Sequence, residues 1–169
     1  MRVLKGTGVS PGVNAGKPLN IERMLDFSIP ATISLDEGIK ELTAKYKSII
    51  KKYNSSSREI EAEVLEAYIL ILNDPELTNS LSELSEANLK EVYDVFLQQS
   101  EVFKQMDDEY FQQRSEDIEA IGKELIFTLQ NISIEFDSDF SQVIFANELT
   151  PNETSSMNLS LVKGFVVKE

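Results

Sequence analysis

The 169-residue sequence predicts an α+β protein in which a four-helix subdomain, made of antiparallel helical hairpins, is inserted into an incomplete α/β subdomain. Three observations carry this prediction: β-type segments near both ends, a long central region of helical periodicity, and no internal repeat of about 20–50 residues. We expect the helical subdomain to span residues 33–131, and residues 1–32 and 132–169 to form the partial α/β subdomain. A chain of this length can build one domain or two small ones.

The terminal segments are of strand type. Val3–Leu4 precedes the turn-rich stretch Gly6–Gly12, and a second strand is expected around Val13–Ile21. Near the other end, Val143–Ala146 and Leu161–Val167 are short apolar runs. Because a lone hairpin is marginally stable, we expect strands from the two ends to pair with each other and to leave one edge open.

Four long central segments show helical periodicity. In the first, Leu35–Tyr53, apolar residues recur every three or four positions, and Ser34 with Glu37 predicts a capping box at its start. The third helix is expected from about Asn88, and the fourth over about Asp107–Leu129. Short links between long amphipathic helices favour antiparallel hairpins.

The second helix is expected to begin with Ser56 and Glu59 as its capping pair. Its predicted buried face carries Ile60, Val64, Ala67 or Tyr68, and Ile71. With Leu65 and Ile69–Leu72 it holds more apolar residues than one stripe can bury. Two explanations are open: part of the second helix covers a neighbour or a partner, or this helix is simply the central helix of its bundle. After it, Asp74–Pro75 predicts the capped start of a shorter helix.

The composition excludes several classes of function. There is no histidine and no cysteine, so a Ser-His-Asp triad, a histidine metal ligand, a phosphohistidine and a CxxC zinc site are all excluded. The net charge of −13 disfavours nucleic acid and favours a basic protein partner. The longest apolar run, Ala67–Leu72, is far too short for membrane insertion. We expect a cytoplasmic protein.

Two further patterns are weighed as ligand sites. Gly6, Gly8 and Gly12 have neither the spacing of a dinucleotide fingerprint nor that of a P-loop, so we expect a plain turn. The acidic residues between Asp107 and Glu119 lie along a helix and do not converge, which favours a solvated or partner-facing surface and no metal site.

Tyr110, Arg114 and Asp117 fall at positions i, i+4 and i+7 of the fourth helix, beside its apolar stripe. This line is either a solvated face, with Arg114 and Asp117 paired, or an interface anchor, because tyrosine and arginine dominate binding hot spots. Both interpretations stay open on the residues alone.

Several short motifs occur together in a characteristic order along nearly the whole chain. They are Ser10–Gly12, Glu66–Leu77, Asp107–Tyr110, Arg114, Asp117–Ile118, Ile121–Gly122, Leu149–Thr154 and Gly164–Phe165. In this order and spacing the sequence resembles the N-terminal domain of Enzyme I, the phosphoenolpyruvate–protein phosphotransferase of the bacterial sugar phosphotransferase system.

The resemblance implies a helical subdomain inserted into an α/β phosphohistidine subdomain. In the family, a separate C-terminal domain binds phosphoenolpyruvate and Mg²⁺, and a histidine receives the phosphoryl group and passes it to the phosphocarrier protein HPr. That histidine would lie past Glu169, so we expect these 169 residues alone to be catalytically inactive and to bind no cofactor. Thr154 resembles the threonine that contacts the acceptor imidazole.

The resemblance also places the HPr-docking surface on the second helix, its short continuation, and the third and fourth helices. The carried-over partner-binding positions are Glu59, Glu63, Leu70, Ile71, Glu76, Leu77, Phe103, Tyr110, Arg114 and Asp117. The expected partners are HPr and the C-terminal phosphoenolpyruvate-binding domain. Full-length relatives dimerise through that domain, so a monomer is expected here.

Two alternatives remain open at this point. One is another relative of Enzyme I, either the nitrogen-related or the dihydroxyacetone-kinase-linked form. The other is a helical scaffold or adaptor protein with no role in phosphotransfer. The second would gain if the strands near the two ends did not share one sheet.

Overall fold

The computed structural model describes residues 6–21, 23–84, 88–133, 140–147 and 149–168. The chain divides into two compact units, which we call the sheet unit and the helical unit. The sheet unit comprises Met1–Glu22, Glu135–Leu149 and Met157–Glu169, and the helical unit comprises Arg23–Ile134 and Thr150–Ser156.

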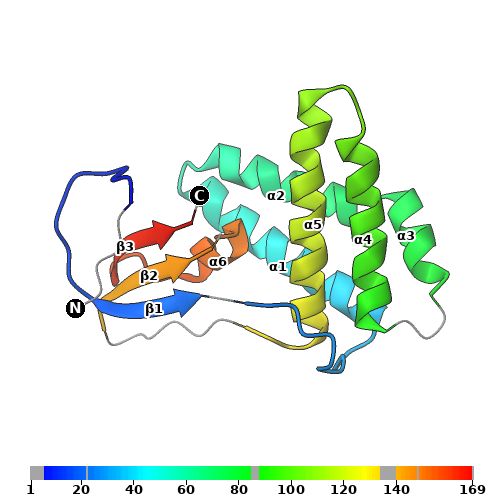
Figure 1. Ribbon diagram of the computed structural model, residues 1–169, viewed down its shortest axis with the longest axis horizontal. Helices are drawn as coiled ribbons and strands as arrows, with labels where there is room; N and C mark the ends of the chain where they lie inside the picture. The colour runs from blue at the N-terminus through cyan, green and yellow to red at the C-terminus, as the bar shows by residue number, and fades with distance from the viewer. Residues whose placement is uncertain (1–5, 22, 85–87, 134–139, 148, 169) are drawn as a thin grey trace. The chain divides into compact units, whose positions relative to one another are not determined.

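The sheet unit holds three parallel strands in the order β1 (Lys17–Ile21), β2 (Gln142–Ala146) and β3 (Val162–Val167) (Figure 1). Strands from the two ends of the sequence therefore share one sheet, as predicted. In the register, Leu19 lies opposite Ile144, and Ile144 is fully buried on the central strand. The predicted strand at Val3–Leu4 lies outside the described residues.

Strand β3 keeps one side unpaired among the described strands, which is the open edge expected from the sequence. Its residues Phe165, Val166 and Val167 are 44–46% exposed. The sheet unit thus leaves apolar residues of an edge strand in contact with solvent, whereas native proteins usually cover such a strand or place charged residues on it.

The helical unit begins with α1 (Leu35–Ser55), whose predicted capping box is confirmed: the Ser34 hydroxyl accepts from the Glu37 N–H, and the Glu37 carboxylate accepts from the Ser34 N–H. The predicted capping pair of the next helix is wrong. Helix α2 (Glu59–Leu72) starts after Arg58, which makes no side-chain cap, while the Ser56 N–H bonds the Tyr53 carbonyl and closes α1.

The predicted buried face of α2 is confirmed at Tyr68 and wrong at Ile60, which is 77% exposed. The residues that are buried on this helix are Ala62, Leu65, Tyr68 and Leu72. The reason is that α2 carries more apolar residues than one stripe can hold, so its sequence period does not select a single face. Packing against α1 and α5 selects it instead.

Side-chain caps mark the starts of the next two helices. Asp74 accepts the N–H groups of Glu76 and Leu77 and starts α3 (Pro75–Ser82), as predicted. Asn88 caps α4 (Leu89–Lys104), and α5 (Glu109–Leu129) and α6 (Pro151–Ser156) complete the helical unit. No helix within the described ranges is long and apolar enough to cross a membrane.

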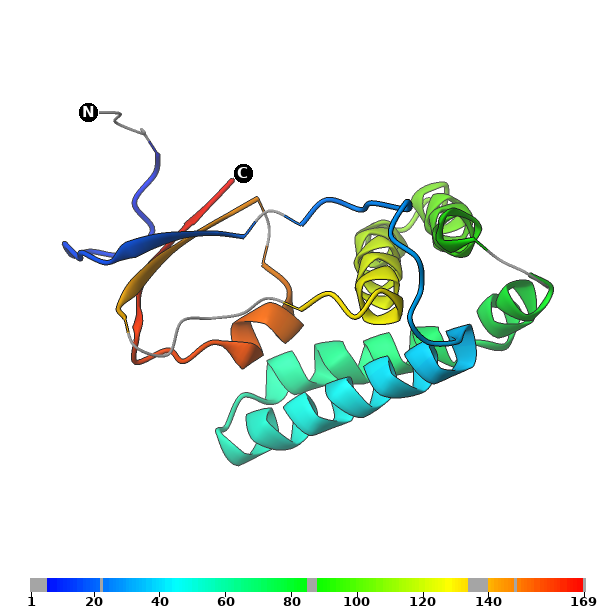
Figure 2. The same ribbon diagram turned by 90° about the horizontal axis from the view of Figure 1, so that it is seen from below.

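The long helices form two hairpins, α1–α2 and α4–α5, that cross each other and do not run parallel as one simple bundle (Figures 1 and 2). Two glycines allow the close approach. A Cβ at Gly38 on α1 would lie 2.5 Å from the Cδ2 of Leu129, and a Cβ at Gly122 on α5 would lie 2.8 Å from the Cβ of Phe96 on α4. Glycine at these positions brings the backbone of one helix against the side chains of its neighbour.

Candidate functional site

An open groove of about 300 Å³ lies on the helical unit, where α2, α3, α4 and α5 meet. The residues that line it are Leu70, Ile71, Asp74, Glu76, Leu77, Gln99, Phe103 and Ile118. Five of these eight side chains are apolar, and two are carboxylates. A concave apolar surface with a few polar groups at its edge is typical of a binding site.

The groove exists because the chain turns sharply between α2 and α3. The Asp74 cap with Pro75 at the first helical position begins α3 almost at once after α2 ends, so that Glu76 and Leu77 face the same space as the end of α2. Leu70 is 73% exposed there, so most of this apolar side chain is accessible to a partner.

Half of the partner-binding residues carried over from the family line this groove. These are Leu70, Ile71, Glu76, Leu77 and Phe103. They differ in accessibility, because Leu70 and Glu76 are exposed, Ile71 and Phe103 are half-buried, and Leu77 is only 2% exposed.

Four of the other five are described by the structure, and none of these four lines the groove. Glu59 and Glu63 are exposed on α2 but do not line the groove. Arg114 and Asp117 lie on α5 beside the lining residue Ile118, and each side chain is 26% exposed. The side chain of Tyr110 lies outside the described part of the structure.

Three lining residues were not among the predicted site residues: Asp74, Gln99 and Ile118. A signal for Gln99 was present, because it precedes Phe103 by four positions and therefore shares its face of α4. Ile118 was assigned to the apolar stripe of the fourth helix and Asp74 to a cap, and neither role by itself indicates a groove.

Beside the groove, Arg114 and Asp117 form an ion pair, and a third residue joins them. The Arg114 Nη1 donates to one oxygen of Asp117 over 3.0 Å, and the hydroxyl of Tyr68 on α2 donates to the other over 2.9 Å. Burial, with the Asp117 carboxylate next, raises the pKa of Tyr68, so this phenol stays protonated and remains a donor.

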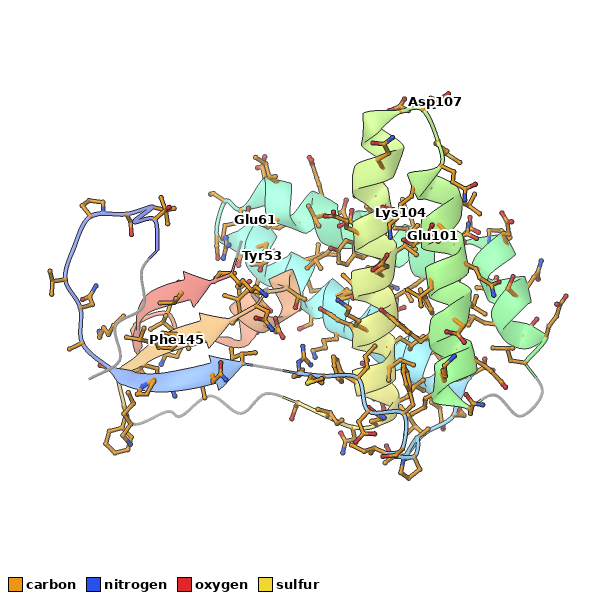
Figure 3. The ribbon with its side chains drawn as sticks, viewed as in Figure 1. Tyr53, Glu61, Glu101, Lys104, Asp107 and Phe145 are labelled. Atoms are coloured by element: carbon orange, nitrogen blue, oxygen red, sulfur yellow. The ribbon has the colours of Figure 1, made fainter. Side chains whose placement is uncertain are left out.

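A second cluster of polar side chains joins α4 to α5. Ser100, which is fully buried, and Lys104 both donate to the Glu119 carboxylate, over 2.9 and 2.6 Å. Burial pushes the pKa of Glu119 upward, but the hydrogen bonds from Lys104 and Ser100 outweigh it and leave that pKa below the usual value. Lys104 also pairs with Glu101 on its own helix (Figure 3).

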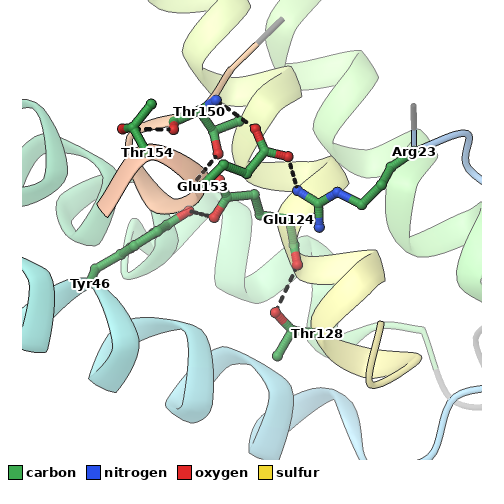
Figure 4. Close-up of polar contacts among 7 residues, drawn as sticks. All are labelled: Arg23, Tyr46, Glu124, Thr128, Thr150, Glu153 and Thr154. Atoms are coloured by element: carbon green, nitrogen blue, oxygen red, sulfur yellow. Dashed lines mark hydrogen bonds and ion pairs between the residues drawn. The ribbon is translucent and has the colours of Figure 1, made fainter. Parts of the chain in front are cut away.

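A separate polar cluster, which shares no residue with the groove, surrounds α6 (Figure 4). The Thr150 hydroxyl and the Glu153 carboxylate form a reciprocal cap at the start of α6, and Arg23 pairs with Glu153. Thr154, the residue carried over as the contact of an acceptor imidazole, donates to the Thr150 carbonyl.

In the same cluster, the Tyr46 hydroxyl donates to Glu124 on α5 over 3.0 Å. Glu124 is 4% exposed. Burial raises its pKa, and the hydrogen bonds that it accepts counteract this only in part. The cluster therefore buries a carboxyl group whose charged form is disfavoured.

A helical unit with a largely apolar groove that also carries two carboxylates, accompanied by a small parallel sheet, defines a domain of mixed α and β structure with a candidate binding groove. Residues 5–114 match the family model described as PEP-utilising enzyme, N-terminal. The chain belongs to this family.

Similar curated proteins share one name, phosphoenolpyruvate-protein phosphotransferase. The protein of Listeria monocytogenes is 30% identical over 96% of this chain, and that of Bacillus subtilis is 30% identical over 98%. The chain spans 31% of the length of each of these relatives.

Two solved structures have a similar fold. An NMR solution structure of Enzyme I is 24% identical, with a TM-score of 0.64 over 79% of this chain and 56% of its own. The N-terminal domain of the nitrogen Enzyme 1 is 18% identical, with a TM-score of 0.65 over 89% of this chain and 68% of its own. At these identities the likeness concerns the fold: long helices with a small parallel sheet.

Proposed function

We propose that this chain is the N-terminal part of a phosphoenolpyruvate–protein phosphotransferase of the sugar phosphotransferase system, and that its groove docks the phosphocarrier protein HPr. In this proposal the helical unit is the HPr-binding subdomain, inserted into a partial phosphohistidine-type α/β subdomain. The protein works in the cytoplasm. Because the 169 residues contain no histidine, a histidine that carries the phosphoryl group would have to come from outside them.

One observation carries the proposal. Leu70, Ile71, Glu76, Leu77 and Phe103 were carried over from the family by motif alone, and these five residues line a single groove. Residues scattered over 34 positions of sequence, on three helices, would not gather in this way if the motif matches were coincidental.

The chemistry of the groove suits a small carrier with a basic rim. Its apolar lining residues supply contact area, and the Asp74 and Glu76 carboxylates in the same lining favour cationic side chains. The net charge of −13 extends this preference over longer distances. Such complementarity mainly raises the association rate and weakens with salt.

Titration of isotope-labelled HPr with this chain tests the proposal. We expect salt-sensitive chemical-shift changes around the carrier's active histidine, and Leu70→Ser should weaken binding at least about fivefold, as expected for a central interface side chain. Leu70 is a better probe than Leu77, because Leu77 is buried and its truncation would also destabilise the fold.

Ile60→Ser is the matched control. Ile60 lies on the same helix with a similar exposure, 77% against 73% for Leu70, but it does not line the groove. It should leave HPr binding unchanged. Equal losses in the two variants would contradict the groove assignment, and no binding at low ionic strength would favour the scaffold alternative.

A further inference from the structure

We propose that Tyr68 is a positioning residue for docking: its buried hydroxyl fixes the Asp117 carboxylate, which in turn holds the guanidinium of Arg114 beside the groove. The inference rests on the proposed function, since docking of a carrier gives the arrangement its use. Its evidence is a chain of contacts that runs from the core of the helical unit to its surface.

The contacts hold one carboxylate from two sides. The Tyr68 hydroxyl donates to Oδ1 of Asp117 over 2.9 Å, and the Arg114 Nη1 donates to Oδ2 over 3.0 Å. A charge-assisted hydrogen bond on each oxygen leaves the carboxylate little rotational freedom.

Burial falls along this chain of contacts. Tyr68 is 5% exposed, and its ring packs edge-on against Tyr46 with the centroids 5.8 Å apart. The Asp117 and Arg114 side chains are each 26% exposed. A tyrosine has only two side-chain torsions, so a packed ring is a rigid anchor, whereas a free arginine samples many rotamers and loses that freedom on binding.

The position of Arg114 relative to the groove gives the anchor a role. Arg114 precedes the lining residue Ile118 by four positions and so lies on the same face of α5. The lining also includes two carboxylates at the start of α3, those of Asp74 and Glu76. A partner that presents a cation to the carboxylates and a carbonyl or carboxylate acceptor to Arg114 would be seated in one orientation.

A double-mutant cycle tests the inference, with Tyr68→Phe and Arg114→Met as the two single variants. Tyr68→Phe keeps the ring and removes only the hydroxyl. We expect each single variant to weaken HPr affinity about three- to tenfold. The affinity of the double variant should be no lower than that of the lower-affinity single variant, because both substitutions act through one contact. The NMR order parameter of the Arg114 Nε should fall in Tyr68→Phe.

Tyr46→Phe is the matched control, because it removes another buried hydroxyl that donates to a carboxylate on α5, that of Glu124. It should change neither HPr affinity nor the Arg114 order parameter. Multiplying losses in the double variant, or an unchanged order parameter in Tyr68→Phe, would overturn the inference. Failure of the unaltered chain to bind HPr would instead overturn the proposed function, and the order parameter would still decide whether Tyr68 positions Arg114.

Discussion

Two sides of the helical unit are built from the same kinds of side chain but differ in their contact with solvent. Where α1, α4 and α5 meet, Phe96, Leu125 and Leu129 are at most 2% exposed. At the groove, Leu70 is 73% exposed, and Phe103 is half-buried. We call these the closed side and the groove side.

The difference separates two uses of apolar surface. On the closed side this surface leaves water when the chain folds and therefore stabilises the fold, at roughly 25 cal/mol per Å². On the groove side much of it would leave water only when a partner binds. Substitutions on the two sides should therefore affect stability and binding separately, and the following predictions test that separation.

The largest effect is expected from Phe96→Ala on the closed side. Phe96 is fully buried, and its truncation leaves a cavity, so the free energy of unfolding should fall by about 3–5 kcal/mol. Urea denaturation measures this. A loss below about 1 kcal/mol would mean that the contact between α4 and α5 repacks easily and is not the closed core described above.

A smaller loss, about 1–3 kcal/mol, is expected from Gly122→Ala, because the added Cβ would meet the Phe96 Cβ at 2.8 Å and force α4 and α5 apart. If Gly122→Ala proved as stable as the unaltered protein, the close approach of the two helices would not be required.

Asp74→Ala tests the boundary between the two sides, because Asp74 both caps α3 and lines the groove. Loss of the cap should cost about 1 kcal/mol of unfolding free energy. Asn88→Ala removes the cap of α4 and should cost a similar amount of unfolding free energy. Asn88 itself does not line the groove. Only Asp74→Ala should also weaken HPr binding, as a titration of both variants would reveal.

The smallest expected effect is a change in stability with pH. Burial raises the pKa of Glu124 above its ordinary value of 4.5, so the folded protein holds this proton more tightly than the unfolded chain does. The resulting stability is fully present below the unfolded pKa and is lost as pH rises through the folded pKa. Glu124→Gln should therefore gain stability relative to the unaltered protein as pH rises from 4 to 7 in urea denaturation, whereas the exposed Glu63→Gln should not.

Much of the helical unit could be predicted from local signals. Ser34 with Glu37, Asp74 with Pro75, and Asn88 each mark a helix start that the structure contains. The start of α2 was missed because Ser56 satisfies the serine-to-glutamate spacing but is used to close α1. The capping pattern is local, and here two neighbouring helices competed for the same residue.

The groove could be predicted only in part. Motif similarity selected Leu70 and Phe103, but the membership of Asp74, Gln99 and Ile118 depends on how α4 and α5 pack against α2 and α3. That packing is set by contacts distant in sequence, such as Gly122 with Phe96. In the same way, Tyr68 was expected at most as a core residue, and its hydrogen bond to Asp117, 49 positions away, needs the folded structure.

The two glycines at helix contacts, Gly38 and Gly122, also differ in what could replace them during evolution. At Gly38 the obstacle is the flexible end of Leu129, so a larger residue at position 38 could be accommodated by a smaller one at position 129, and these two positions should covary among relatives. At Gly122 the obstacle includes the Cβ of Phe96, which every residue except glycine possesses. Only a second glycine, at position 96, would clear this contact, so a lineage that lost Gly122 would have had either to give up Phe96 or to shift one of the two helices.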